Sequence, residues 1–239
     1  GIALACIRAY LIIIKYEKGL TKIMGFIGII LVLILFCILL LIPNKEKSER
    51  KVEVVKEKKA VFFSYIELQK YVKNTNVSDS KKSVDNIVNT LDEYKFNMLI
   101  LQVRSFSDAI YESKLFPWSS SVSSSEGITP GYDVLAYFIK RCHEKNIEVH
   151  AWVNPYRIRN NNDTSTISEK NKAYSLLNTN SVQISEGGIF YNPASEEVKI
   201  LIVDGISEIV SNYSVDGILF DDYFYPTQDG VFDQAEYDA

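Results

Sequence analysis

The chain has 239 residues, of which 47% are hydrophobic, and a formal net charge of −4. This length supports one sizeable core rather than several domains, and the mildly acidic balance argues against a nucleic-acid partner. Two histidines, and three cysteines without a CxxC pair, provide neither a zinc motif nor a disulfide framework, so we expect no metal and no cofactor.

An unbroken apolar segment lies near the start of the chain. Residues 24–42, MGFIGIILVLILFCILLLI, carry no charged side chain and would span about 28 Å as a helix, close to the hydrocarbon thickness of a bilayer. No small-residue cleavage site follows, which predicts a transmembrane anchor. Residues 1–23 are apolar and basic. Residues 43–59 are a charged linker, either a solvated stalk or a patch for lipid headgroups.

From residue 60 onward, predicted strands alternate with predicted helices. The strands are expected at 60–68, 96–104, 147–155 and 215–223, where β-branched and aromatic residues dominate. The helices are expected at 83–94, 131–146 and 192–213, where apolar residues recur at helical spacing.

This alternation indicates an α/β fold with parallel strands and right-handed crossovers. It fits the first half of a (β/α)8 barrel of the TIM type over residues 60–239, truncated after the fourth strand. A small open α/β sheet is the alternative.

Polar residues of one parity mark the expected inner face of this barrel. In the third strand that set is Glu148, His150, Trp152 and Asn154, and in the second strand Gln102 and Arg104 share a parity. Catalytic groups of such barrels lie at the carboxyl ends of the strands. Those ends carry Arg104, Asn154, Tyr156, Arg157, Asp221 and Asp222. Cations, an amide, aromatics and carboxylates are therefore predicted to meet at one rim.

The stretch VDGILFDDYFYP, residues 215–226, places two carboxylates side by side after an apolar run. Because side chains alternate along a strand, only one of the pair can face the interior. Asp221 shares its parity with Leu219 and Tyr223 and is the expected inward carboxylate. Asp222 would then hydrogen-bond a loop or a neighbouring arginine. Helix capping or turn chemistry is the simpler interpretation of the pair.

Simpler structural roles are also open for other candidates. His150 could be a core histidine with its hydrogen bonds satisfied, and Arg104 could be the counter-ion of a buried aspartate. Arg157 and Arg159 could be ordinary surface charges. The serine-rich stretch at 119–127 is predicted to be a flexible loop.

Four stretches give the sequence a resemblance to a known family. They are AVFFSYIEL, NMLILQVRSFSDAIYESKLFPWS, GYDVLAYFIKRCHEKNIEVHAWVNPYR and VDGILFDDYFYP, and they cover most of residues 60–226. In this order and at these spacings they resemble the glycosyl-hydrolase-like family 10 proteins. The resemblance implies a (β/α)8 barrel that acts on glycan outside the cytoplasm. Some members of that family are linked to peptidoglycan strands stripped of their peptides.

The resemblance also implies which residues line a substrate groove. They are Gln102, Arg104, Asp108, Tyr111, Trp118, His150, Trp152, Asn154, Tyr156, Arg157, Asp221 and Asp222. Tyr223 joins them as a candidate through its parity with Asp221. Trp118, Trp152 and Tyr156 are candidate stacking platforms for sugar rings, and Arg104, Asn154 and Arg157 are candidate hydrogen-bond donors. The sequence departs from the family at Leu219, where members commonly carry histidine.

Glycoside hydrolysis uses one carboxylic acid that protonates the leaving oxygen and one carboxylate that attacks the anomeric carbon or activates water. Asp221 is assigned as nucleophile or base, Asp222 is its alternate, and the general acid is expected in the missing half of the barrel.

The predicted function is therefore a membrane-anchored glycoside hydrolase that acts on cell-wall glycan. The lysines around residues 24–42 favour the opposite orientation by the positive-inside rule, but long domains cross membranes largely regardless of such charges. A glycan substrate places the globular domain outside the cell, attached to the membrane by a single span. The alternatives are a non-catalytic glycan-binding module and an inactive fragment of a longer hydrolase.

Overall fold

The computed structural model describes residues 57–73, 76–185 and 187–238, together with the helical residues Arg8, Ile12, Lys15, Gly19, Thr21, Lys22, Met24 and Ile34. The chain divides into two compact units, Gly1–Val55 and Lys56–Ala239. Across the described residues, no helix is both long enough and apolar enough to cross a bilayer. The predicted anchor at 24–42 lies outside the described residues, apart from Met24 and Ile34.

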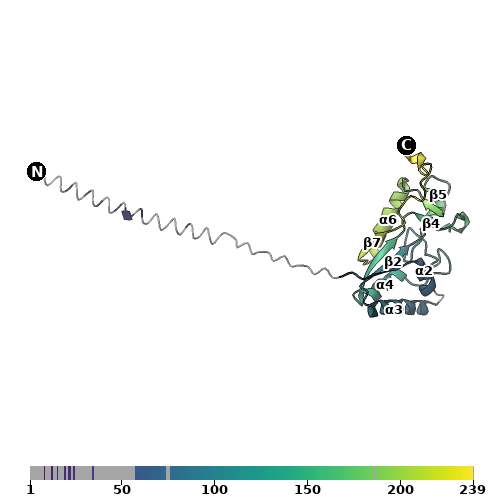
Figure 1. Cartoon of the computed structure of the whole chain (residues 1–239), viewed down its shortest axis with the longest axis horizontal. Helices are drawn as coiled ribbons and strands as arrows, with labels where there is room; N and C mark the ends of the chain where they lie inside the picture. Colours follow the sequence, from purple (N-terminus) through teal and green to yellow (C-terminus); the bar gives the residue numbers. More distant parts are fainter. Residues whose placement is uncertain are drawn as a thin grey trace. The chain divides into compact units, whose positions relative to one another are not determined.

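A four-stranded parallel sheet forms the centre of the second unit (Figure 1). Its strands, in spatial order, are β1 (Ala60–Phe63), β2 (Met98–Arg104), β3 (Glu148–Val153) and β7 (Gly217–Phe220). The predicted α/β class and the parallel direction of these four strands are confirmed. The described strands form an open sheet with β1 and β7 at its edges, and they do not close into a barrel.

Three long helices connect the parallel strands. They are α3 (Val77–Glu93), α4 (Val134–His143) and α6 (Glu196–Asn212). The predicted helix at 83–94 begins earlier than expected because the Asn76 side chain accepts the N–H of Ser78 at 2.8 Å and caps α3 at that point. Asp133 caps α4 in the same way, by accepting the N–H of Ala136 at 2.8 Å.

The hydrophobic core lies between these helices and one face of the sheet. Leu99 and Leu101 of β2 are buried together with Val84 and Val88 of α3. In β3 burial alternates strictly, with Val149, Ala151 and Val153 buried and the residues between them half-buried. The predicted alternation of β3 is therefore confirmed, and it leaves His150 and Trp152 on the face away from the helices.

The end of β2 departs from the predicted alternation. Gln102 lies in register with Trp152, but Arg104 lies in register with Val153, so Val103 is an extra residue in the strand. A bulge of this kind moves the following side chain to the other face of the sheet. The prediction that Gln102 and Arg104 share a face is therefore wrong, and Arg104 lies on the helix-covered side.

The predicted strand at 60–68 ends at Phe63. The Ser64 side chain accepts the N–H of Ile66 at 3.2 Å, and Glu67 accepts the N–H of Ser64 at 2.8 Å, which together form a capping box. This box starts α2 (Tyr65–Glu67), which continues as the π-helix η1 (Leu68–Val72). The capping-box motif S-x-x-E can be recognised in the sequence, and it ends the strand although the β-branched and aromatic residues of the stretch favour a longer one.

A second sheet, absent from the prediction, follows β3. Its antiparallel strands, in spatial order, are β4 (Arg157–Arg159), β6 (Gly188–Tyr191) and β5 (Val182–Ser185). Further short elements are η2 (Thr164–Thr166), α5 (Lys172–Leu176) and α7 (Gln234–Tyr237). Strands of three or four residues carry too few positions for a period of two to stand out from the loops around them.

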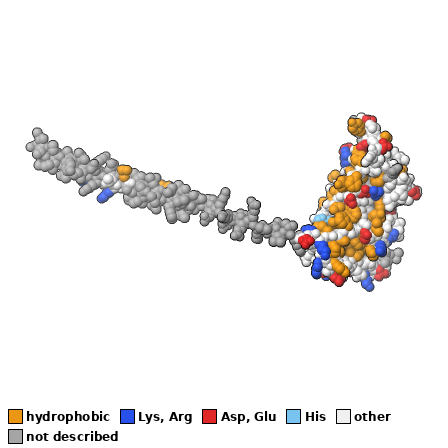
Figure 2. Space-filling model, in the orientation of Figure 1, with side chains coloured by type: hydrophobic (Ala, Val, Ile, Leu, Met, Phe, Trp, Pro, Cys, Tyr) orange, Lys and Arg blue, Asp and Glu red, His pale blue; other side chains and the backbone are white. Residues whose placement is uncertain are grey.

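Hydrophobic side chains gather on the visible face of the second unit (Figure 2). On α6, Ile200, Val203 and Val210 are more than half exposed, and Phe220 at the sheet edge is 43% exposed. Exposed apolar surface of this extent is typical of a contact surface rather than of a solvated helix.

Candidate functional site

The carboxyl ends of the four parallel strands lie along one edge of the sheet, and their loops form a common rim. Hydrogen bonds continue past the strand ends, because Asn154 N–H donates to Arg104 C=O at 2.9 Å and Asp221 N–H donates to Val153 C=O at 3.1 Å. The backbone hydrogen bonds of the sheet thereby extend to the first residues after β3 and β7.

The two adjacent aspartates after β7 are held differently. Asp222 has a φ of +52°, and its carboxylate forms a two-point ion pair with the Nε and Nη2 atoms of Arg157, the latter at 3.0 Å. Asp221 Oδ1 accepts the N–H of Asp222 at 2.8 Å. In the described part of the chain, Asp221 forms no ion pair. The expectation that one aspartate binds a neighbouring arginine is confirmed, and that aspartate is Asp222.

Arg157 is fixed by the second sheet as well as by Asp222. Its guanidinium lies over the Phe190 ring, 4.8 Å from the ring centroid, and its Nη1 donates to Gly187 C=O at 3.3 Å. A guanidinium held by a carboxylate, an aromatic face and a carbonyl is positioned rather than free in solvent. Arg157 is therefore part of the rim and not an ordinary surface charge.

Trp152 and His150 lie on the open face of β3, below the rim. Trp152 Nε1 donates to Asn154 Oδ1 at 3.0 Å, and the Phe62 ring contacts the indole edge-on at a centroid distance of 5.7 Å. Leu219 is in register with Trp152, so Asp221, two residues further on, belongs by alternation to this same face.

His150 lies in a charged environment rather than in an apolar core. Its Nε2 is 3.3 Å from Glu148 Oε2, and Glu148 also pairs with Lys58. The hydrogen bond from Lys58, together with the one from His150, holds the pKa of Glu148 below its ordinary value against the effect of burial. Gly217 lies beside the imidazole, where a Cβ would come within 2.5 Å of Nδ1.

Gln102 is buried and has a positioning role in the structure. Its Oε1 accepts the N–H of Tyr65 at 2.9 Å and so fixes the turn that follows β1. The Tyr65 ring in turn contacts the Phe106 ring edge-on, with centroids 4.8 Å apart.

Arg104 and Tyr111, which the resemblance places in the groove, lie in the interior. Arg104 is 2% exposed, and its guanidinium lies 4.1 Å from the centroid of the Phe116 ring, against Gly205 of α6. Tyr111 is fully buried edge-on to Tyr213, and burial raises its pKa to about 12. The bulge in β2 explains the placement of Arg104, because it turns this side chain toward α6.

The remaining aromatic candidates differ in exposure. Trp118 and Tyr156 are half-buried in the loops after β2 and β3, and Tyr156 packs against the hydrophobic core. Tyr223 is 57% exposed and contacts Phe224 at a centroid distance of 4.8 Å. Among the three candidates Trp118, Tyr156 and Tyr223, Tyr223 is therefore the most accessible, and it lies next to the aspartate pair in the sequence.

A polar pocket opens beside the rim, between the loops that follow β1, β2 and β3. It encloses about 420 Å³ and is lined by Tyr65, Phe106, Asp108 and Arg159, among others. Asp108, which the resemblance also places in the groove, is 4% exposed and contributes to the wall of this pocket. Of the buried candidates after β2, Asp108 alone lines this pocket.

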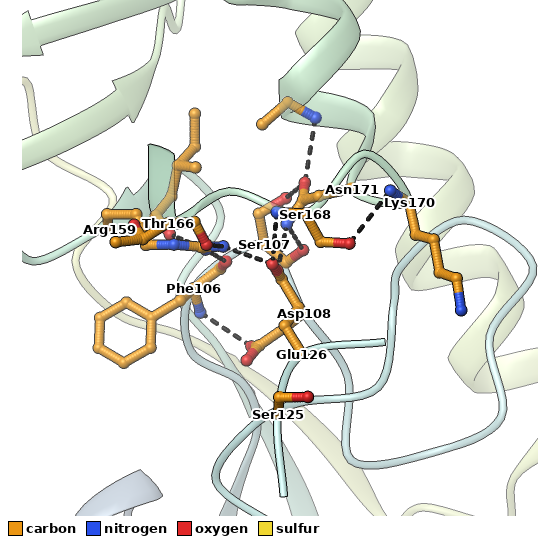
Figure 3. Close-up of polar contacts among 12 residues, drawn as sticks. Phe106, Ser107, Asp108, Ser125, Glu126, Arg159, Thr166, Ser168, Lys170 and Asn171 are labelled. Atoms are coloured by element: carbon orange, nitrogen blue, oxygen red, sulfur yellow. Dashed lines mark hydrogen bonds and ion pairs between the residues drawn. The ribbon is translucent and has the colours of Figure 1, made fainter. Parts of the chain in front are cut away.

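A network of polar contacts in the wall of the pocket joins the loop after β2 to Arg159 of β4 and to the loop after β4 (Figure 3). Glu126 and Arg159 form an ion pair at 2.6 Å, with both side chains 12% exposed. Glu126 also accepts the Asn171 Nδ2–H at 2.7 Å and the Ser168 N–H at 2.9 Å. Sequence reasoning missed this network because its members are spread over short, irregular segments.

The serine-rich loop is held in place by its own residues. Ser119, Ser121 and Ser123 are buried, and the Ser123 hydroxyl lies 3.0 Å from Ser119 C=O and 2.7 Å from Ser125 C=O. Val122 is buried with them. The prediction of a loop at 119–127 is therefore confirmed, but buried side chains pack this loop against the protein, and its two runs of consecutive serines carry no signal of that packing.

Metal-ligating residues do not cluster in the described ranges. No group of three or more His, Cys, Asp or Glu side chains there is arranged to hold a metal ion.

Comparison with known proteins relates the second unit to a family of hydrolase-like proteins. The family described as "Glycosyl hydrolase-like 10" matches residues 59–238. Glycosyl hydrolase YngK of Bacillus subtilis is 35% identical over 170 residues, which are 70% of this chain and 33% of that protein. Glycosyl hydrolase DigH of Escherichia coli is 34% identical over 147 residues, 59% of this chain and 34% of that protein. The chain thus spans about a third of these curated relatives.

Two solved structures that this chain matches have low sequence identity to it. A hypothetical protein from Ruminiclostridium thermocellum has a TM-score of 0.47 at 13% identity, covering 70% of this chain and 78% of that one. Alpha-L-fucosidase isoenzyme 2 from Paenibacillus thiaminolyticus has a TM-score of 0.46 at 15% identity, covering 70% of this chain and 23% of that one.

Proposed function

The chain belongs to the glycosyl hydrolase-like 10 family, and from this premise we propose that it is a glycoside hydrolase whose rim at Asp221 acts on cell-wall glycan. The observation that carries the proposal is the division of the aspartate pair. Asp222 is committed to Arg157, whereas Asp221 keeps a half-buried carboxylate without an ion pair among the described residues. A carboxylate that is positioned but not neutralised is suited to attack an anomeric carbon or to activate water.

Each rim residue has a role in this proposal. Asp221 is the nucleophile or base. Asp222 and Arg157 hold the turn after β7, and Arg157 offers its remaining N–H groups to sugar oxygens. Trp152 and Tyr223 offer aromatic faces to the C–H faces of pyranose rings. The acid that protonates the leaving oxygen is proposed to lie outside the described residues.

The proposed substrate is a peptide-free peptidoglycan strand, and the proposed location is outside the cell membrane. The long apolar segment at 24–42 supports attachment by a single membrane span. An extracellular domain would give the rim access to cell-wall glycan.

The test is the release of soluble oligosaccharides from peptide-free peptidoglycan strands by the intact protein. We expect Asp221→Asn to lower the rate by on the order of a thousandfold, as is typical for loss of a catalytic carboxylate. Asp229→Asn, an exposed aspartate in the next loop, is the matched control and should release glycan at the parental rate. Release by Asp221→Asn at the parental rate would exclude Asp221 from the chemistry.

A non-catalytic glycan-binding module is the second candidate. The aromatic and polar groups of the rim are sufficient to bind a glycan. Beside them, Asp221 is the one rim aspartate without an ion pair among the described residues, whereas hydrolysis uses two carboxyl groups. Binding of the strands without release, by both the parent and Asp221→Asn, would establish this function instead.

A further inference from the structure

The pocket beside the rim has the size and walls of a small-molecule site. Its volume of about 420 Å³ falls within the range of ligand pockets, roughly 300–1,000 Å³. The rings of Tyr65 and Phe106, 4.8 Å apart with their planes at 72°, form an apolar wall. Ser124 and Asn160, with other neutral residues of their loops, line the remainder.

Arg159 lines this pocket, yet its guanidinium is not available to an anion. Its Nη1 donates to Ile158 C=O at 2.7 Å and to Phe106 C=O at 3.1 Å. Its Nη2 donates to Glu126 Oε2 at 2.6 Å and to Thr166 C=O at 3.1 Å. These four contacts use all four Nη hydrogens, so the two-point geometry that recognises carboxylates and phosphates is already occupied.

Asp108 is the acidic group of the pocket that forms no ion pair among the described residues, and it lacks a full set of hydrogen-bond partners. Its Oδ1 accepts the N–H of Phe106 at 3.1 Å and that of Ser105 at 3.4 Å. Its Oδ2 accepts no hydrogen bond from any residue that the structure describes. A carboxylate oxygen at the wall of a pocket, without a donor from the described residues, can accept a hydrogen bond from water or from a ligand hydroxyl or amide N–H.

The charge of the pocket follows from these contacts. Glu126 and Arg159 neutralise each other, Asp108 adds one negative charge, and no lysine is among the lining residues. The lining serines and asparagines offer both donors and acceptors without charge. An acidic ligand would therefore be repelled by the carboxylate of Asp108, with no lysine in the lining to offset the repulsion. A neutral ligand rich in hydroxyl and amide groups could instead donate a hydrogen bond to Asp108.

From this geometry we propose that the pocket is a subsite for a neutral pyranose bearing hydroxyl and amide groups, and that it discriminates against acidic sugars. The inference rests on the proposed function, since it places one unit of the same glycan beside the Asp221 rim. Asp108 accepts the donor of the sugar, and the Tyr65–Phe106 wall packs against its apolar face.

The test is the affinity of the intact protein for two probes, measured by titration calorimetry. Chitotetraose is the neutral probe, and tetragalacturonate, in which every sugar unit carries a carboxylate, is the acidic one. Asp108→Asn keeps the acceptor for the Phe106 N–H and replaces Oδ2 by a donor. It should weaken chitotetraose binding by on the order of tenfold and leave the acidic probe unchanged or better bound.

Two further variants complete the test. Ser124→Phe fills the pocket from its exposed rim and should also weaken chitotetraose binding, so the proposal remains falsifiable if Asp108→Asn does not fold. Asp79→Asn, on the exposed part of α3, is the control for loss of a charge and should bind both probes as the parent does.

The outcomes separate this inference from the function on which it rests. Parental binding of chitotetraose by both Asp108→Asn and Ser124→Phe would overturn the subsite and leave the glycan function standing. Tighter parental binding of the acidic probe would overturn the stated preference. Failure of the parent to bind chitotetraose while it still releases oligosaccharides from peptide-free strands would overturn the subsite alone, and failure of both would overturn the glycan function together with the subsite.

Discussion

Asp222 has a φ of +52°, in the left-handed region that side chains other than glycine rarely adopt. Asparagine and aspartate tolerate this conformation better than other residues because their short polar side chains hydrogen-bond locally. The turn it makes brings the carboxylate of Asp222 onto Arg157 and leaves that of Asp221 to the rim. The backbone of one residue thereby separates the roles of two identical neighbours.

The consequence for stability can be measured by urea unfolding. Asp222→Asn and Asp222→Ala both remove the ion pair to Arg157, but only alanine also opposes the left-handed backbone. We expect Asp222→Ala to be less stable than Asp222→Asn by about 1 kcal/mol. Equal free energies of unfolding for the two variants would contradict the assigned role of the backbone.

Gly205 makes room for the buried guanidinium of Arg104. A Cβ at this position would come within 2.1 Å of Arg104 Nη1 and 2.8 Å of the Phe116 ring. We expect Gly205→Ala to lower the free energy of unfolding by about 1–3 kcal/mol through overpacking. Gly230→Ala, where a Cβ meets nothing within 4 Å, is the matched control and should be close to neutral. Comparable urea midpoints for the two variants would refute the packing assigned to Arg104.

At the scale of elements, the long helices and strands can be predicted from the sequence, whereas the short strands cannot. The strands β2 and β3 and the helices α4 and α6 have enough residues for a period to be read, and they are found where expected. The antiparallel strands β4, β5 and β6 are too short for such a period to be read, although they support Arg157 and Arg159. A single extra residue, Val103, is invisible in the pattern of β2 yet moves Arg104 to the opposite face.

Asp216 links α4 to the sheet and gives the fold a dependence on pH. Burial raises its pKa, but hydrogen bonds from the Val149 N–H and from His143, both at 2.8 Å, outweigh burial and hold that pKa below its ordinary value. A lowered pKa in the folded state means that the unfolded chain binds more protons in this range. The stabilisation is therefore present above the ordinary pKa of aspartate and is lost as pH falls through the lowered one.

Asp216→Asn should flatten this dependence. Between neutral pH and about pH 3, we expect the variant to lose less stability than the parent does, because the titrating group is gone. Urea unfolding at a series of pH values measures the effect, and Asp79→Asn on the exposed part of α3 controls for the change in net charge. An unchanged slope of stability against pH in Asp216→Asn would show that other groups govern it.

At the scale of the whole molecule, the rim is the part of the site that sequence could predict. Parallel strands bring their carboxyl ends to one edge whatever the loops between them do, and Asn154, Arg157 and the aspartate pair follow from that rule alone. The pocket could not be predicted, because its walls come from three separate loops whose shape depends on buried serines and on the Glu126–Arg159 pair. The chain spans about a third of the length of its curated relatives, so the proposed catalysis concerns the activity of a full-length protein.

The measurement that tests the central claim most directly is azide rescue of Asp221→Ala in the intact protein, with peptide-free peptidoglycan strands as substrate. Removing a carboxylate that attacks the anomeric carbon, or that activates water to do so, leaves space for an external nucleophile. We predict that Asp221→Ala alone releases almost no glycan, that azide restores release, and that the product carries a glycosyl azide. Full activity of Asp221→Ala without azide would contradict the assignment of Asp221 as the carboxylate that drives glycan cleavage.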